Sequence, residues 1–111
     1  YLPMMYMPDA VLALMRVAEA DIAELKHHAD FNVNAMSFAP EELAEEIGKR
    51  VPGFTMDYEV DPLRQSIADS WPNSLDDSAA REEWGWQPEF GMEAMVDDML
   101  SNLSRKLGPY P

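Results

Sequence analysis

The first part of the chain, residues 1–20, has the sequence YLPMMYMPDAVLALMRVAEA. Residues 1–8 are an apolar run that ends in a proline, which predicts a buried strand or an extended entry segment. Asp9 is of a residue type that caps helices, and apolar residues follow it at helical spacing. These residues are Val11, Leu14, Met15 and Ala18. We therefore predict a helix from Asp9 to about Ala20, with its apolar stripe facing a core.

A second helix is predicted over residues 40–50, because Pro40 suits the first helical position and acidic residues follow it. Its apolar positions share one side of the helix, which we expect to be the inner face. They are Leu43, Ala44 and Ile47. The opposite side carries glutamates that we interpret as a solvated face, namely Glu41, Glu42, Glu45 and Glu46.

Two further helices have clear termination signals, since a glycine follows each of them. They are a short helix that Asp77 or Ser78 caps and that ends at Trp84, and a long helix that runs from Met92 to just before Gly108. We expect short strands at residues 31–34 and 54–58, and a loop over residues 63–77. The fold class is then α/β, with about four helices and two or three short strands.

The composition is typical of a single small globular domain. Of the 111 residues, 47% are hydrophobic and 26% are charged, which is close to ordinary globular usage. The formal charge is −13, and so acidic a surface is repelled by nucleic-acid backbones and anionic lipid headgroups. No apolar run approaches the roughly 18 residues of a membrane span. We therefore expect no nucleic-acid partner, no membrane partner and a cytoplasmic location.

Few residue patterns in the chain carry catalytic or ligand-binding chemistry. His27 and His28 are adjacent, so on a helix they would point in different directions and could not share a metal ion. The five glycines are too widely spaced for a phosphate-binding loop. Adjacent acids such as Asp76 and Asp77 are typical of capping or solvated groups. We therefore predict no metal site, no cofactor site and no catalytic residue within the chain.

Five blocks of the sequence resemble a known family. They are LPMMYMPD at residues 2–9, AMSF at 35–38, RQ at 64–65, IADSWP at 67–72 and WGW at 84–86. The blocks are similar to those of NAD-dependent L-threonine 3-dehydrogenases of the short-chain type, which are akin to UDP-galactose 4-epimerase. The resemblance implies that residues 1–111 form a single domain, the C-terminal substrate-binding lobe of an extended short-chain dehydrogenase/reductase, with the Rossmann sheet largely absent. Because the first residue is Tyr1, we expect a fragment of a longer enzyme.

The resemblance also implies a reaction, in which the parent enzyme oxidises L-threonine to 2-amino-3-ketobutyrate by hydride transfer to NAD. The family's glycine-rich dinucleotide motif and its catalytic Tyr-x-x-x-Lys pair have no counterpart in this chain, so the chain alone should bind no cofactor and be inactive. Two residues are candidates for substrate binding. Trp71 lies in a loop that covers the active site in related enzymes, and Arg64 takes the place of the arginine that binds nucleotide sugars in the epimerases.

Each candidate has a structural alternative. Trp71 could instead be a packing anchor, and Arg64 could instead pair with Asp69 or another local carboxylate. We interpret Trp84 and Trp86 as core residues. Ala39 stands where many relatives have a capping Thr or Ser, which should weaken the start of the helix by about 1 kcal/mol.

Two other functions stay open at this point. The chain could be the lobe of a nucleotide-sugar epimerase or dehydratase, or it could be a non-catalytic acidic binding module. Related dehydrogenases dimerise through their cofactor domain, so we expect this chain to expose methionine and aromatic side chains on one face. Such a face would be available for a homo-oligomer.

Overall fold

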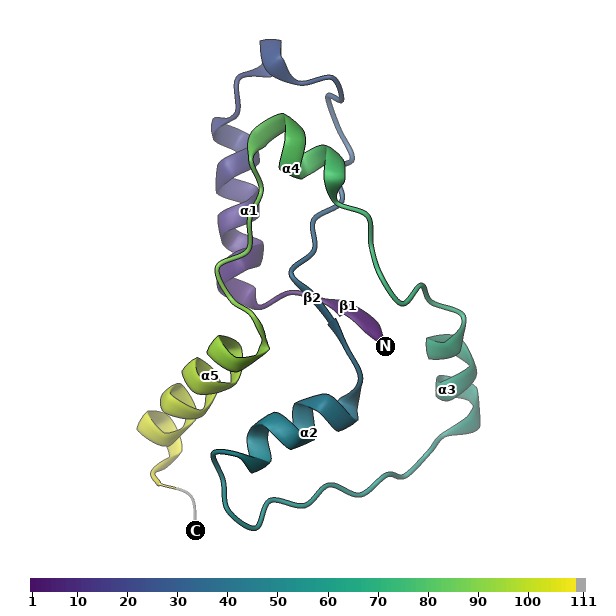
Figure 1. Ribbon diagram of the computed structural model, residues 1–111, viewed down its shortest axis with the longest axis vertical. Coiled ribbons are helices and arrows are strands. Elements are labelled where there is room, and N and C mark those ends of the chain that lie inside the picture. The colour runs from purple at the N-terminus through teal and green to yellow at the C-terminus, as the bar shows by residue number, and fades with distance from the viewer. Residues whose placement is uncertain (110–111) are drawn as a thin grey trace.

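The computed structural model describes residues 1–109, and within them the chain forms five α-helices and one two-stranded sheet (Figure 1). In chain order the elements are β1 (Leu2–Met4), α1 (Met7–Glu19), a single 3₁₀ turn η1 (Ile22–Glu24), β2 (Met36–Phe38), α2 (Pro40–Gly48), α3 (Pro62–Asp69), α4 (Ser78–Trp84) and α5 (Met92–Leu107). The predicted α/β class and helix-rich architecture are confirmed. Helices α1 and α4 lie side by side at one end, α2 and α5 lie towards the other, and the sheet lies between them.

The sheet fixes where two of the helices begin. Strands β1 and β2 pair antiparallel, with Leu2 opposite Phe38 and Met4 opposite Met36. Helix α1 follows β1 and helix α2 follows β2, so the pairing holds the two helix starts near each other. The strand predicted within residues 1–8 is present, but it is half-buried to exposed and not buried as predicted.

The strand predicted at residues 31–34 is wrong, because pairing starts only at Met36. The backbone of this segment binds side chains near α4 instead of a neighbouring strand. Asn34 N donates to Asp77 Oδ2 at 3.2 Å, and Trp86 Nε1 donates to Asn34 O at 3.0 Å. These hydrogen bonds satisfy the polar backbone groups that a sheet would otherwise satisfy.

Buried residues form two hydrophobic clusters, one near each end of the molecule. The first consists of Ala13, Ala80 and Trp86, with Met5, Leu12, Phe31, Val33 and Trp84 packed against it. The second consists of Phe38, Met95 and Val96, with Tyr6, Met36, Leu43, Ile47, Met92 and Leu100 packed against it. Trp86 is completely buried, as predicted for a core residue, whereas Trp84 is only half-buried.

The buried Asp9 carboxylate links α1 to the connection between α4 and α5. It is 1% exposed, and its Oδ1 and Oδ2 accept hydrogen bonds from Glu89 N at 2.9 Å and Phe90 N at 3.0 Å. The prediction that Asp9 caps α1 is wrong, because the helix begins at Met7 after Tyr6. The carboxylate instead anchors the connection between α4 and α5 to the first turns of α1.

An ionic cluster joins α2 to α5. The Arg50 guanidinium donates to the carboxylates of Glu46 on α2 and Asp97 on α5. Lys49 Nζ donates to Glu46 Oε2 at 2.6 Å. Glu46 is 6% exposed. The prediction that Glu46 belongs to a solvated face is therefore wrong, because α5 covers it and two cations neutralise it.

The apolar stripe predicted to face inward from α1 is largely exposed. Val11, Leu14 and Met15 are 50%, 70% and 56% exposed. The side of α1 that faces α4 carries the small residue Ala13, which allows the two helices to approach closely. The helix prediction is thus confirmed and its predicted orientation is wrong.

Residues 51–77 also depart from the sequence-based expectation. The predicted loop at 63–77 contains α3, and the predicted strand at 54–58 has no regular structure and no paired strand. Helix α3 stands apart from the rest of the molecule, and a long connection leads to it on each side (Figure 1).

The molecule is open rather than closely packed. Its radius of gyration is 17.2 Å and its extents are 53 × 36 × 19 Å, whereas a compact domain of this length has a radius of about 13 Å. Its accessible surface is 8250 Å², against about 6,200 Å² for a compact protein of this mass. The excess of about 2,000 Å² is surface that a self-contained domain would bury.

Candidate functional site

Helix α3 carries Arg64 and leads directly to Trp71, the two residues predicted to bind substrate. The helix begins where Asp61 Oδ1 accepts hydrogen bonds from Leu63 N at 2.9 Å and Arg64 N at 3.1 Å, and Pro62 takes the first helical position. An Asp-Pro pair of this kind is a helix-start signal in the sequence. The loop prediction overlooked it.

Arg64 lies in the first turn of α3, which ends at Asp69, and Trp71 follows two residues after that end. The Arg64 side chain is 88% exposed, and its Nε lies 3.8 Å from Asp61 Oδ2. Asp69, the other partner considered for Arg64, accepts a hydrogen bond from Gln65 Nε2 at 2.7 Å. Trp71 is 57% exposed, so it is not a packing anchor within the described residues. Helix α3 and the residues just after it therefore present a solvated guanidinium and an accessible indole.

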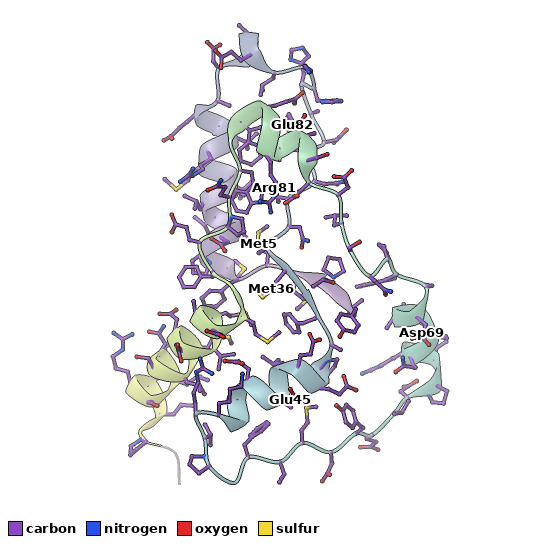
Figure 2. The ribbon with its side chains drawn as sticks, in the orientation of Figure 1. Met5, Met36, Glu45, Asp69, Arg81 and Glu82 are labelled. Atoms are coloured by element: carbon purple, nitrogen blue, oxygen red, sulfur yellow. The ribbon has the colours of Figure 1, made fainter. Side chains whose placement is uncertain are left out.

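Helix α3 also borders a cleft of about 320 Å³. Gln65, Ala68 and Asp69 form one wall of the cleft, while the other wall includes Leu2, Met4, Phe38, Pro40 and Leu43. Figure 2 shows Asp69 on α3, set apart from Met36 on β2 and Glu45 on α2. Neither Arg64 nor Trp71 lines this cleft, so the two predicted site residues do not meet a cavity formed by this chain.

An apolar groove at the α1 end of the molecule was not predicted from the sequence. The groove has a volume of about 630 Å³ and lies between α1, η1 and residues 28–33. Its apolar lining includes Leu14, Val17, Ile22, Leu25, Phe31 and Trp84. The signal was present in the apolar stripe of α1, but periodicity alone does not distinguish a groove wall from a buried core face.

The described tyrosines are not poised as catalytic bases. A tyrosine that removes a proton from a hydroxyl near neutral pH needs a lowered pKa. Here a hydrogen bond to Glu42 raises the pKa of Tyr1, and a hydrogen bond to Asp98 at 2.8 Å raises the pKa of Tyr6. Desolvation raises the pKa of Tyr58. All three shifts oppose deprotonation.

Two carboxyl groups with shifted pKa values belong to the ionic cluster between α2 and α5. Hydrogen bonds from Lys49 and Arg50 hold the pKa of Glu46 below its ordinary value. A hydrogen bond from Arg50 does the same for Asp97. Because these groups are paired and lie away from α3, we interpret their shifts as structural rather than catalytic.

The helix starts of this chain do not fit a dinucleotide. A pyrophosphate is usually held by free N–H groups of a helix N-terminus that follows a glycine-rich turn. In α1, α2 and α3 a proline occupies the first turn and removes one such N–H. Helix α5 has Gly91 as its N-cap, but Glu93 and Asp97 lie beside it and would repel a pyrophosphate.

Two other kinds of feature bear on function. Among residues 1–109, no three His, Cys, Asp or Glu side chains are grouped so that they could hold a metal ion. No helix in the same part of the chain is both long and apolar enough to cross a bilayer.

Comparison with known proteins places these features in context. No model of a known protein family matches the chain. It is 47% identical over 106 residues to an uncharacterized epimerase/dehydratase of Staphylococcus haemolyticus, a match that covers 96% of this chain and 33% of that protein.

Solved structures give a closely similar fold. The X-ray structure of L-threonine dehydrogenase from Clostridium difficile matches with a TM-score of 0.90 and 51% identity, over 96% of this chain and 33% of that one. The holo form of a GalE-like L-threonine dehydrogenase from Cupriavidus necator matches with a TM-score of 0.87 and 49% identity, over 92% of this chain and 33% of that one.

These matches confirm the resemblance inferred from the five sequence blocks. Nearly the whole chain is similar in sequence and in fold to the C-terminal portion of L-threonine dehydrogenases. The chain spans about a third of the length of the curated relative and of the solved structures. The roles of Arg64 and Trp71 in substrate binding stay predictions.

Proposed function

We propose that this chain is the substrate-binding lobe of an NAD-dependent L-threonine 3-dehydrogenase, with residues 1–111 acting as a single domain. The observation that carries the proposal is the 0.90 TM-score and 51% identity with the Clostridium difficile enzyme. Arg64 and Trp71 support it, because both side chains are exposed, one on α3 and one just after it, and α3 stands apart from the packed body. Side chains in this position can complete a pocket whose other wall belongs to another part of the protein.

In this proposal the substrate hydroxyl of L-threonine is oxidised to the ketone of 2-amino-3-ketobutyrate. NAD, when bound, accepts the hydride, and the residues that hold NAD and remove the hydroxyl proton lie outside this chain. The Arg64 guanidinium is suited to holding a carboxylate, and the Trp71 indole is suited to covering the bound amino acid and excluding water. The chain alone is then inactive.

Other parts of the proposal concern partners and location. L-threonine is the small-molecule partner, and the −13 charge disfavours nucleic acid and anionic membranes. The enzyme is cytoplasmic, and a homo-oligomer would form through surface that this chain exposes.

A nucleotide-sugar epimerase or dehydratase is the second candidate, since the curated relative is described as an uncharacterized epimerase/dehydratase. A nucleotide sugar brings a diphosphate, which needs several cations or free backbone N–H groups. Arg64 is the only Lys or Arg between residues 51 and 80, where six Asp and Glu side chains occur. That charge balance favours an amino acid, whose ammonium group is attracted to carboxylates.

The test uses a chimera, defined as the Clostridium difficile dehydrogenase in which this chain replaces the third that it matches. We expect threonine-dependent NADH formation and no epimerisation of UDP-galactose. In the chimera, Trp71→Ala should lower kcat/KM for threonine by tenfold or more, about 1.4 kcal/mol of transition-state binding.

The matched control is Ser66→Ala on α3, the helix that leads to Trp71. It removes an exposed hydroxyl that donates a hydrogen bond to Leu63 O in the first turn of that helix. It should leave kcat/KM unchanged. Epimerase activity without threonine oxidation would favour the second candidate. A folded chimera with neither activity would leave the non-catalytic binding module as the better account.

A further inference from the structure

Residues 52–67 form an unbroken run in which every side chain is exposed. Within it, Phe54, Met56, Tyr58 and Val60 alternate with polar or acidic residues and are 38%, 36%, 55% and 62% exposed. Alternation at period two is typical of a strand with one buried face. Within the described residues no strand pairs with this segment, and its four apolar side chains stay at least 36% exposed.

The uncovered apolar surface continues onto α3. Leu63 and Ile67 lie one helical turn apart on α3 and are 70% and 49% exposed, and Trp71, just after the helix, is 57% exposed. The segment and the helix are consecutive in the chain, so together they form one apolar strip over residues 54–71. We call these residues the arm.

We propose that the arm docks onto the part of a longer dehydrogenase chain that this chain does not cover, with residues 54–60 adding a strand to its surface and α3 packing by its apolar face. This inference rests on the proposed function. It names the surface through which the lobe meets the rest of the enzyme. Backbone groups of an extended segment give such strand addition its affinity, and alternate side chains give it specificity.

The area available fits an interface of this kind. The chain exposes about 2,000 Å² more than a compact protein of its mass, whereas a standard interface buries about 800 Å² on each partner. The matched structures are about three times as long as this chain, so a body large enough to cover the arm exists in each of them.

Charge argues against a second copy of this chain as the occupant. The arm carries Asp57, Glu59 and Asp61 on the residues that alternate with its apolar ones, and each copy has a formal charge of −13. Pairing two arms edge to edge would place acidic side chains opposite one another, which destabilises a sheet. The surface that accepts the arm should therefore be neutral or basic beside the added strand.

Hydrogen exchange tests the docking directly. In the isolated chain we expect the amides of residues 54–60 to exchange rapidly, because they make no backbone ladder. In the chimera they should exchange at least about 100-fold more slowly, while the amides in the middle of α5 should be protected in both proteins. Equal exchange of the arm in the two proteins would overturn the proposal. Protection in the isolated chain that grows with its concentration would also overturn it, since a second copy would then cover the arm.

Two neighbouring substitutions make the test specific to one face. Met56→Glu places a charge on the apolar strip, and Thr55→Glu places the same charge on the opposite face. We expect Met56→Glu to remove the added protection in the chimera and Thr55→Glu to retain it. Equal effects of the two substitutions would contradict the docking geometry.

This readout does not depend on catalysis. A chimera that protects the arm but oxidises no threonine would support the docking and contradict the proposed function. An active chimera with an unprotected arm would overturn the docking and leave the proposed function standing.

Discussion

Trp86 and Trp71 have the same side chain and opposite surroundings. Trp86 is completely buried between α1 and α4, and its Nε1 donates to Asn34 O at 3.0 Å. Trp71 ends the arm and is 57% exposed. The first belongs to a body that finds its partners within the chain. The second belongs to a segment whose large apolar side chains are each at least 36% exposed.

The exposure of the arm does not follow from a polar sequence. The arm carries aromatic, methionine and branched aliphatic side chains, as the two buried clusters do. What differs is the presence of a covering element, because the arm runs away from the sheet and α3 stands apart (Figure 1). A segment with core-like residues and no cover is most simply a core shared with another body.

The largest expected effect separates the two tryptophans. Trp86→Ala should lower the free energy of unfolding of the chain by about 3–5 kcal/mol, since it opens a cavity in a packed cluster. Trp71→Ala should change that free energy by less than about 0.5 kcal/mol, as exposed substitutions usually do. Urea unfolding followed by circular dichroism measures both. Comparable losses would mean that the arm packs within the chain in solution.

A second pair of substitutions compares a buried with an exposed aspartate. Asp9→Ala leaves the N–H groups of Glu89 and Phe90 without their acceptor and should cost about 2–4 kcal/mol of unfolding free energy. Asp57→Ala, on the arm, should be nearly neutral. The same urea unfolding measures the difference. A nearly neutral Asp9→Ala would remove the anchor between α1 and the α4–α5 connection from this account.

The ionic cluster makes the stability of the chain depend on pH in the acidic range. The pKa values of Glu46 and Asp97 are lowered by their cationic partners, so the stability that these carboxylates contribute is present above their ordinary pKa values of 4.5 and 3.8. It is lost as the pH falls through their lowered values in the folded chain. Arg50→Gln should therefore weaken the loss of stability on acidification, and Arg64→Gln, which alters an exposed 3.8 Å pair, should leave it unchanged. Thermal unfolding between neutral pH and about pH 3 decides this, and parallel profiles for wild type and Arg50→Gln would contradict it.

The smallest expected effect is a gain. Ala39 is the N-cap of α2, has extended backbone angles and offers no side-chain acceptor. Ala39→Ser should stabilise the chain by about 0.5–1 kcal/mol, because its hydroxyl can accept an N–H from the first turn. Ser78→Ala in α4 is a useful contrast, since the N-cap of that helix is the preceding residue. Differential scanning calorimetry of the two variants should show a raised midpoint for Ala39→Ser alone.

The body of the fold could be predicted where local signals agree. Helices α4 and α5 begin and end where their caps, apolar spacing and following glycines predict. The orientation of α1 could not be predicted, because the apolar spacing of Leu14 and its neighbours identifies one side of a helix but does not show what covers that side. Burial of Glu46 likewise depends on Asp97 and α5, which lie far along the chain.

The arm and the candidate site were harder to predict for a related reason. Helix α3 has an Asp61-Pro62 start signal but an irregular apolar pattern, since its exposed apolar face is not matched to a core within the chain. Arg64 and Trp71 came from family resemblance, and the structure adds that both side chains are exposed. Exposed methionine and aromatic side chains occur on α1 and on the arm, among them Met15, Met56 and Tyr58, and that they share one face stays a prediction.

The most direct test of the account is calorimetric titration of NAD, with NADH formation from threonine as its companion, on the isolated chain and on the chimera. We predict no saturable NAD binding and no NADH from the chain alone, and both from the chimera, because the helix starts of this chain do not fit a pyrophosphate and none of Tyr1, Tyr6 and Tyr58 has a lowered pKa. Saturable NAD binding by the isolated chain, at about micromolar affinity, would contradict the account.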